Sequence, residues 1–254
     1  MAIPLRKLNE IEKLRTANIA VAKTLNYLKE NVKAGMTLKE VDAMGEEFLD
    51  NLNARPSFKG LYGFPNAICT SLNEVIIHGI PSDVVLKEGD ILGIDIGTEI
   101  DGWYGDAAIT MPIGKISKED EDLIACAKDS LYHAIDSIHE GMRFKELSKL
   151  IEDFIVSRGY QPLVRFCGHG IGKKPHDEPE IPNYIGNGKT NSGPKIKNGM
   201  VFCLEPMICQ KEREPVILDN KWDVVSADGL RGSHYEHTVA VVDGKAVILS
   251  TDED

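Results

Sequence analysis

The amino-acid sequence predicts an α+β fold in which amphipathic helices cover an antiparallel sheet. Four segments place apolar residues at three- and four-residue steps, which is typical of amphipathic helices. Apolar runs also flank Asp101-Gly102 and Asp243-Gly244, and Asp-Gly between such runs is typical of a tight hairpin turn. The same order of elements occurs twice, so we expect a pseudo-two-fold duplicated unit.

In the first half, one helix begins near Asn9 and stops near Gly35. A second helix follows at once, because Thr37 with Glu40 three residues later forms a capping box. The second half repeats the pair. One helix runs from Ser117 toward Gly141, and another ends at Gly159.

The two halves also share a strand pattern. Each contains His-Gly-Ile, then Lys-x-Gly, then an apolar strand that ends in an acid. At one constant offset, Lys87, Gly89, Ile91, Ile94 and Asp95 fall on Lys197, Gly199, Val201, Leu204 and Glu205. Coincidence is the alternative, because short apolar strands look alike. The shared order of elements favours duplication, with halves of about 1–113 and 114–254 in one domain spanning 1–254.

Composition excludes several classes of protein. The net charge of −11 leaves no positive surface for a nucleic-acid backbone. Five cysteines without a C-x-x-C pair indicate reduced thiols in a cytoplasmic protein. The N-terminal segment turns charged where a signal peptide is apolar, and no apolar stretch approaches the roughly 18 residues of a membrane span.

Two carboxylates are expected to lie together on the first hairpin. If the Asp101-Gly102 turn has two loop residues, counting back places Asp95 opposite Ala108. Asp106 is two residues from Ala108, so Asp95 and Asp106 share one face on a diagonal, about 7–8 Å apart at Cα. A lone Asp in a strand is usually an edge or surface residue, which remains the alternative for Asp106.

Two further acids have a similar setting. Glu205 follows an apolar strand, and Glu236 lies in the final strand run. Buried anions are tolerated when they are paired or bind a metal, and no Arg or Lys lies inside these strands. Two divalent cations would balance the four carboxylates. His169, framed by glycines, is the natural imidazole to complete the set.

The other histidines form three pairs: His133 and His139, His234 and His237, and His78 and His176. The first pair falls in a charged helix and is expected at the surface. The second resembles an H-x-x-H ligand pair, but on a strand its members point to opposite faces, which favours structural roles. The residues alone leave the third pair, in Gly/Pro-rich loops, open between structural and functional roles.

Two other motifs lack the required spacing or geometry. The segment GHGIGKK resembles a phosphate-binding loop, but it has three residues instead of four before its Gly-Lys and lacks the Ser or Thr. Cys167 near His169 suggests a thiol nucleophile. Such a nucleophile needs its thiol beside the imidazole ring, and nothing in the sequence supports that geometry.

The combined segments resemble the type I methionine aminopeptidases, which have the pita-bread fold. The resemblance covers nearly the whole chain and rests on NEVIIHGIP, DIG with DGWYGDAA, GHGIG, LEPM and YEHT. With no zinc-ribbon extension before Asn9 and no long insertion in the second half, we expect the compact bacterial form.

The resemblance implies a catalytic domain with two divalent metal ions. The implied ligands are Asp95, Asp106, His169, Glu205 and Glu236. Carboxylate-rich sites with one imidazole suit Mn(II), Fe(II) or Co(II) better than zinc, but the sequence does not choose among these ions, zinc and nickel. The resemblance further implies that these ions would acidify a shared water and that one of them would bind the substrate α-amine.

Residue roles follow from the same resemblance. Glu205 would be the general base, His176 would donate to the developing oxyanion, and His78 would contact the scissile amide. The implied methionine pocket contains Phe58, Leu61, Phe64, Cys69 and Trp222. The first three depart from the Cys or Tyr that the family often carries, and Pro175 replaces a frequent Phe.

The implied reaction removes N-terminal methionine from nascent proteins and peptides, with a small second residue preferred. Expected partners are nascent N-termini, including those at the ribosome, with no nucleic acid or membrane, and we expect a monomer. One alternative is a binding protein of the same fold that has lost its metal ligands, although all five positions are filled here. Another is a proline-specific aminopeptidase, which usually carries a large N-terminal domain.

Overall fold

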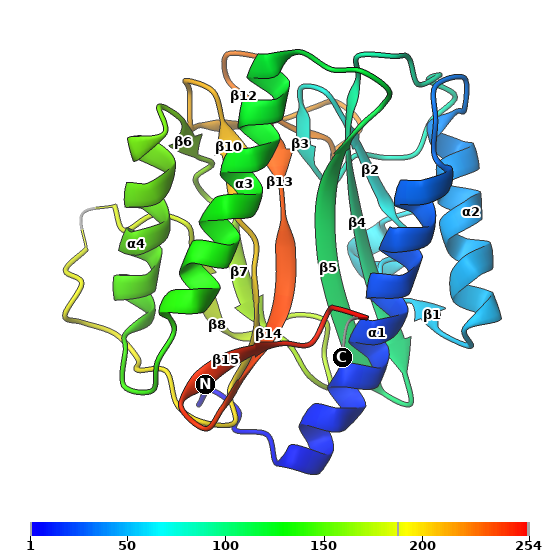
Figure 1. The fold of residues 1–254 in the computed structure, drawn as a ribbon. Helices are drawn as coiled ribbons and strands as arrows, with labels where there is room; N and C mark the ends of the chain where they lie inside the picture. The colour runs from blue at the N-terminus through cyan, green and yellow to red at the C-terminus, as the bar shows by residue number, and fades with distance from the viewer. Residues whose placement is uncertain (1, 187, 253–254) are drawn as a thin grey trace.

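The computed structural model describes residues 2–186 and 188–252 (Figure 1). The four predicted helices are confirmed as α1 (Leu8–Asn31), α2 (Leu38–Asn51), α3 (Lys118–Ser137) and α4 (Phe144–Ser157). The predicted capping box is present, because Glu40 N donates to Thr37 Oγ1 at 3.1 Å and Thr37 N donates to Glu40 Oε2 at 2.6 Å. These bonds satisfy two backbone donors that a helix start leaves unpaired.

A nine-stranded antiparallel sheet forms the centre of the fold. Its main path runs β1 (Arg55–Pro56), β4 (Ile91–Ile100), β5 (Trp103–Pro112), β14 (Glu236–Val242), β9 (Val201–Leu204), β7 (Cys167–Gly170) and β8 (Asp177–Pro182). β2 (Cys69–Leu72) pairs with β4, and β15 (Lys245–Ile248) pairs with β14. The long central strands therefore come from both halves of the chain.

Two small three-stranded sheets and one turn of 3-10 helix complete the described elements. One sheet contains β13 (Ser233–His234), β10 (Met207–Cys209) and β6 (Gln161–Pro162). The other contains β11 (Pro215–Ile217), β12 (Val224–Ser226) and β3 (Val75–Ile77). The 3-10 turn is η1 (Leu61–Gly63).

Both predicted hairpins are confirmed. Ile100 pairs with Trp103 across the Asp101-Gly102 turn, and the register then places Asp95 opposite Ala108 as expected. Val242 pairs with Lys245 across the second Asp-Gly turn. Asp101 and Gly102 have φ of 52° and 76°, the left-handed conformation that a type I′ turn requires of both central residues.

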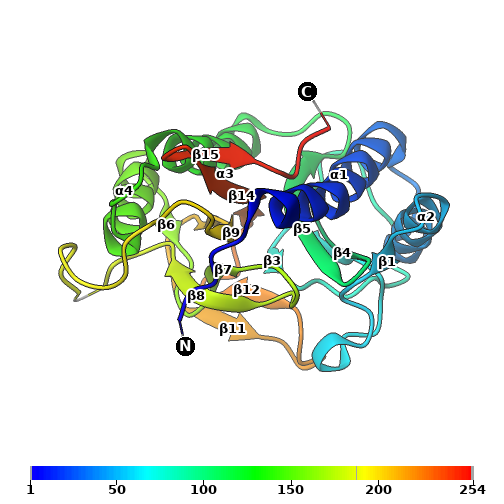
Figure 2. The ribbon, with the colours of Figure 1, turned by 90° about the horizontal axis from the view of Figure 1, so that it is seen from below.

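The helices pack on one side of the sheet, which Figure 2 shows edge on. α1 and α2 share a core with β4 and β5, and α3 and α4 share another with β9 and β14. Ile94 and Ile96 point into the first core, so strand alternation turns Asp95 to the opposite face. Each fully buried Ile contributes about 1.5–3 kcal/mol. This apolar packing therefore fixes the face on which the acids stand.

The five cysteines are all free, and Cys167 is the half-buried one. Among the described residues, no helix has the length and apolar character needed to span a membrane.

Candidate metal centre

Four acids from four neighbouring strands converge on the face away from the helices. Asp95 comes from β4, Asp106 from β5 and Glu236 from the start of β14, and Glu205 directly follows β9. Asp106 and Glu236 are only 3% and 2% exposed. One oxygen each of Asp95, Asp106 and Glu236 is buried without a hydrogen-bond partner. The structure thus brings together all four acids named from the sequence.

The acids have an environment that suits divalent cations. Among the described residues, none of their ion pairs involves Lys or Arg. Burial raises the pKa of all four carboxyls, and the charges of neighbouring carboxylates raise it further for Asp106, Glu205 and Glu236. Unpaired buried carboxylates are costly, and bound cations would supply the missing partners.

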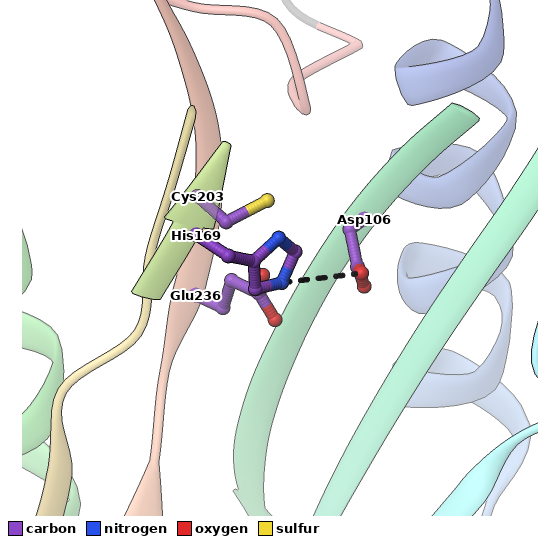
Figure 3. A group of neighbouring side chains, drawn as sticks. All are labelled: Asp106, His169, Cys203 and Glu236. Carbon is purple, nitrogen blue, oxygen red and sulfur yellow. Dashed lines mark ion pairs between the residues drawn. The ribbon is translucent and has the colours of Figure 1, made fainter. Parts of the chain in front are cut away.

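His169 reaches the acids from β7, opposite Asp106 on β5 (Figure 3). Its Nε2 lies 4.0 Å from Asp106 Oδ2 and 3.5 Å from Glu205 Oε1. Its Nδ1 donates to the Gly170 carbonyl at 3.0 Å, because a carbonyl can only accept. Burial lowers the pKa of His169 to about 3. Neutral His169 therefore directs a bare Nε2 lone pair at the acids, as a metal ligand requires.

The glycines beside His169 allow this approach. A Cβ at Gly168 would meet the Cys203 carbonyl of β9, and one at Gly170 would meet the Glu178 carbonyl of β8. Side chains at these two positions would therefore push β7 away from its neighbours.

Two further residues, Cys203 and His234, lie near the acids, where the sequence did not place them. Cys203 Sγ, with atoms of Asp106, His169 and Glu236, forms a group within 4.8 Å (Figure 3). The Nε2 of His234, which the sequence assigned a structural role, lies 3.8 Å from Glu205 Oε2. Strand alternation could have found both, since each stands two residues before an acid.

All the predicted catalytic, metal and pocket residues line one cavity of about 510 Å³. The His176 ring stands 4.4 Å from the His169 ring. The His78 ring lies 5.5 Å from that of Phe166 and 6.4 Å from that of Trp222. Burial lowers the pKa of His78 to about 4 and also lowers that of His176. Residue patterns alone left the roles of His78 and His176 open, and the structure places both imidazoles at the same cavity.

The apolar wall of the cavity is one packed cluster. Phe58, Phe64 and Cys69 are buried, and Leu61 and Trp222 pack against them. The Phe64 and Trp222 rings meet edge to face at 5.0 Å. By contrast, the expected surface histidines, His133 and His139, are exposed and do not line this cavity. Only His133 lies in the predicted helix, because α3 ends at Ser137 and His139 pairs with Lys245.

His237 lies in β14, whereas His234 ends β13. Its Nδ1 bonds to Ser250 Oγ at 2.8 Å and its Nε2 to Tyr132 Oη at 3.0 Å. The two side chains diverge as predicted, but they stand on two strands instead of one, and His234 lies beside Glu205.

The model of metallopeptidase family M24 matches residues 12–243. The chain belongs to metallopeptidase family M24. It is an enzyme of a family that uses divalent metal, with the pita-bread fold expected from the sequence. Its resemblance to type I methionine aminopeptidases is likewise confirmed.

Several relatives of this M24 metallopeptidase match along nearly their full length. It is 61% identical to a methionine aminopeptidase of Helicobacter pylori, covering 98% of this chain and 99% of that protein. Methionine aminopeptidase 1 of Bacillus subtilis is 39% identical, with 95% and 96% covered. The crystal structure of methionine aminopeptidase from Thermotoga maritima has a TM-score of 0.95 at 34% identity, covering 99% and 100%.

More distant structures share the fold alone. A prolidase from Pyrococcus furiosus has a TM-score of 0.80 at 22% identity, covering 98% of this chain and 66% of that one.

Proposed function

We propose that this M24 metallopeptidase removes the N-terminal methionine from nascent proteins and peptides and prefers a small second residue. One observation carries the proposal: buried carboxylates with partnerless oxygens share a cavity with a packed apolar wall. The names of its close relatives support the same reaction.

We assign two divalent ions, drawn from Mn(II), Fe(II), Co(II), zinc and nickel, to Asp95, Asp106, His169, Glu205 and Glu236. Held by these residues, divalent ions would acidify water and polarise a peptide carbonyl. Glu205 accepts the proton of the attacking water. His176 donates an N–H to the oxygen on which charge develops, and His78 contacts the scissile amide as the amine departs.

The apolar cluster binds the methionine side chain. Aromatic rings such as Phe64 and Trp222 favour contact with a thioether sulfur by about 0.3–1.5 kcal/mol. Phe58, Leu61 and Cys69 complete the same apolar wall. Charged side chains would lose hydration there without gaining a partner. The pocket therefore selects a long apolar first residue.

Residues 1–254 act as one catalytic domain built of two related halves, and the chain works as a monomer in the cytoplasm. Its substrates include N-termini emerging at the ribosome.

The test measures metal content together with cleavage of Met-Ala-Ser and Ala-Pro peptides. We expect about two divalent ions per active chain, release of methionine, and no cleavage of Ala-Pro. Glu205→Ala removes a ligand and the base and should abolish turnover. Full activity in verified metal-free protein, or faster cleavage of Ala-Pro, contradicts the proposal.

A further inference from the structure

His234 is a buried histidine in a fixed position beside Glu205. It is 3% exposed, and its Nε2 has no hydrogen-bond partner. Its backbone N–H donates to Thr110 Oγ1 at 2.9 Å, and that hydroxyl donates to the His234 carbonyl at 2.9 Å. A single side chain of β5 thus holds both backbone groups of His234, so the imidazole starts from a defined place.

Glu205 lies between two imidazoles that differ in chemistry. His169 Nε2 is 3.5 Å from Oε1, and His234 Nε2 is 3.8 Å from Oε2. The bond from His169 Nδ1–H to Gly170 leaves its Nε2 as an acceptor, which cannot pair with a carboxylate unless a cation lies between them. The partnerless Nε2 of His234 can instead carry a proton and donate it to Oε2.

A hydrogen bond at Oε2 would restrict the rotation of the Glu205 side chain. Its backbone carbonyl is held by Asn183 Nδ2 at 2.9 Å, which fixes the start of the side chain but leaves its torsions free. A donor at Oε2 would select the rotation in which Oε1 faces His169. The contact must shorten from 3.8 Å to about 3 Å, a movement within the reach of those torsions.

We propose that His234 is a positioning residue that donates an Nε2–H hydrogen bond to Glu205 Oε2 and so holds Oε1 toward the metal centre. The inference rests on the proposed role of Glu205 as ligand and base. Hydrogen-bond partners of metal ligands typically contribute 10–100-fold to metal affinity. His234 therefore acts on the metal through Glu205 and is not itself a ligand.

The test compares variants with and without the donor. His234→Leu keeps an apolar body but removes the N–H, and His234→Met is a second donor-free variant. His234→Gln retains an N–H of similar reach. We expect calorimetric titration with Mn²⁺ to show about 10–100-fold weaker binding for the donor-free variants and near wild-type binding for His234→Gln. The visible spectrum of the Co²⁺-loaded protein should change in the donor-free variants and should match the wild-type spectrum in His234→Gln.

His237→Leu is the matched control, because His237 lies in the next strand, β14, and bonds to Tyr132 of α3 and to Ser250. It should lower the melting temperature of metal-free protein without changing Mn²⁺ affinity. Wild-type Mn²⁺ affinity and Co²⁺ spectrum in a donor-free variant would overturn the inference while leaving the proposed function intact. A His234→Gln variant as weak as His234→Leu would overturn it too, by showing a packing role. Failure of wild-type protein to bind divalent ions would instead contradict the proposed function, and with it this inference.

Discussion

Asp95 and Glu236 share a cross-strand partner, because Ala108 of β5 pairs with Asp95 of β4 on one side and with Glu236 of β14 on the other. Directly paired residues in antiparallel strands lie about 4.5–5.5 Å apart. The two carboxylates therefore flank a single methyl group. The small side chain at position 108 puts little bulk between them.

Enlarging that methyl group should impair metal binding. In Ala108→Val, added carbons would enter the space between the two acids, and we expect metal affinity to fall by about 10–100-fold. Calorimetric titration with Mn²⁺ measures the change. Ala107→Val is the control, because Ala107 faces the helices. Overpacking should cost each variant about 1–3 kcal/mol of stability, but Ala107→Val should keep wild-type affinity. Equal affinities for the two variants would contradict the prediction.

Without metal, the folded protein should become less stable as the pH rises. In the metal-free protein the carboxyl pKa values are raised, to about 7 for Asp95. The folded state then holds protons that the unfolded chain has released, so unfolding releases protons and a rising pH favours it. Buried histidines with lowered pKa oppose this effect only below about pH 6.5, where unfolded histidine is charged.

We therefore expect the melting temperature of chelated protein to fall between about pH 6.5 and pH 8. Metal-loaded protein should lack this trend, since bound cations keep the folded carboxylates deprotonated. Thermal unfolding across this range, with and without metal, measures both curves. A flat or rising curve for the metal-free protein would show that these carboxyls do not hold protons.

Replacing His176 should affect turnover more than metal binding. Its ring packs against His169 but it is an expected donor to the oxyanion, not a ligand. His176→Ala should lower kcat by about 10²–10³-fold, which is typical for loss of one oxyanion donor. Steady-state kinetics and metal analysis of the same sample check both points. An unchanged kcat, or loss of metal, would refute the assignment.

Arg6, which precedes α1, should stabilise the segment around Gly172 and Asp177 that carries His176. The Arg6 side chain occupies the space where a Cβ at Gly172 would lie, pairs with Asp177 at 3.7 Å and stacks over Trp103 at 5.7 Å. Gly172→Ala would displace the guanidinium and break the same contacts that Arg6→Ala removes. The double variant should therefore be less destabilised than the sum of the single variants, with a coupling of about 0.5–3 kcal/mol.

Denaturant unfolding of the wild type, Arg6→Ala, Gly172→Ala and the double variant measures the coupling. Each kcal/mol should also shift the melting temperature by about 2–4 °C. Strict additivity would mean that Gly172 and Arg6 act independently.

The pocket should discriminate by charge more than by shape. Apolar pockets separate similar side chains by about 1–3 kcal/mol, so norleucine should be released within about 200-fold of methionine. Lysine or glutamate should fail, because the side chains around Phe64 and Trp222 are apolar and burying a charge among them is costly. Values of kcat/KM for otherwise identical peptides decide this. Efficient lysine release, or rejection of norleucine by more than about 10⁴-fold, would place the methionine side chain elsewhere.

The sequence by itself determined the helices, both hairpins and the pairing of Asp95 with Ala108. These features depend on interactions over short stretches of chain: helical periodicity, capping at Thr37, and the turn chemistry of Asp101-Gly102. Resemblance to a family added the roles of His78 and His176, which residue patterns left open and which stay predictions.

Only the tertiary structure decided which distant strands are neighbours. β14 lies between β5 and β9, and this order brings Glu236 and Glu205 to the acids of the first hairpin. The same order places His234 beside Glu205, although the spacing of His234 and His237 alone favoured a structural role. Hydrophobic alternation specifies the face of each residue but not the neighbour of each strand, because any apolar strand face can pack in a common core. Contacts across the sheet therefore follow from the packing of the whole chain.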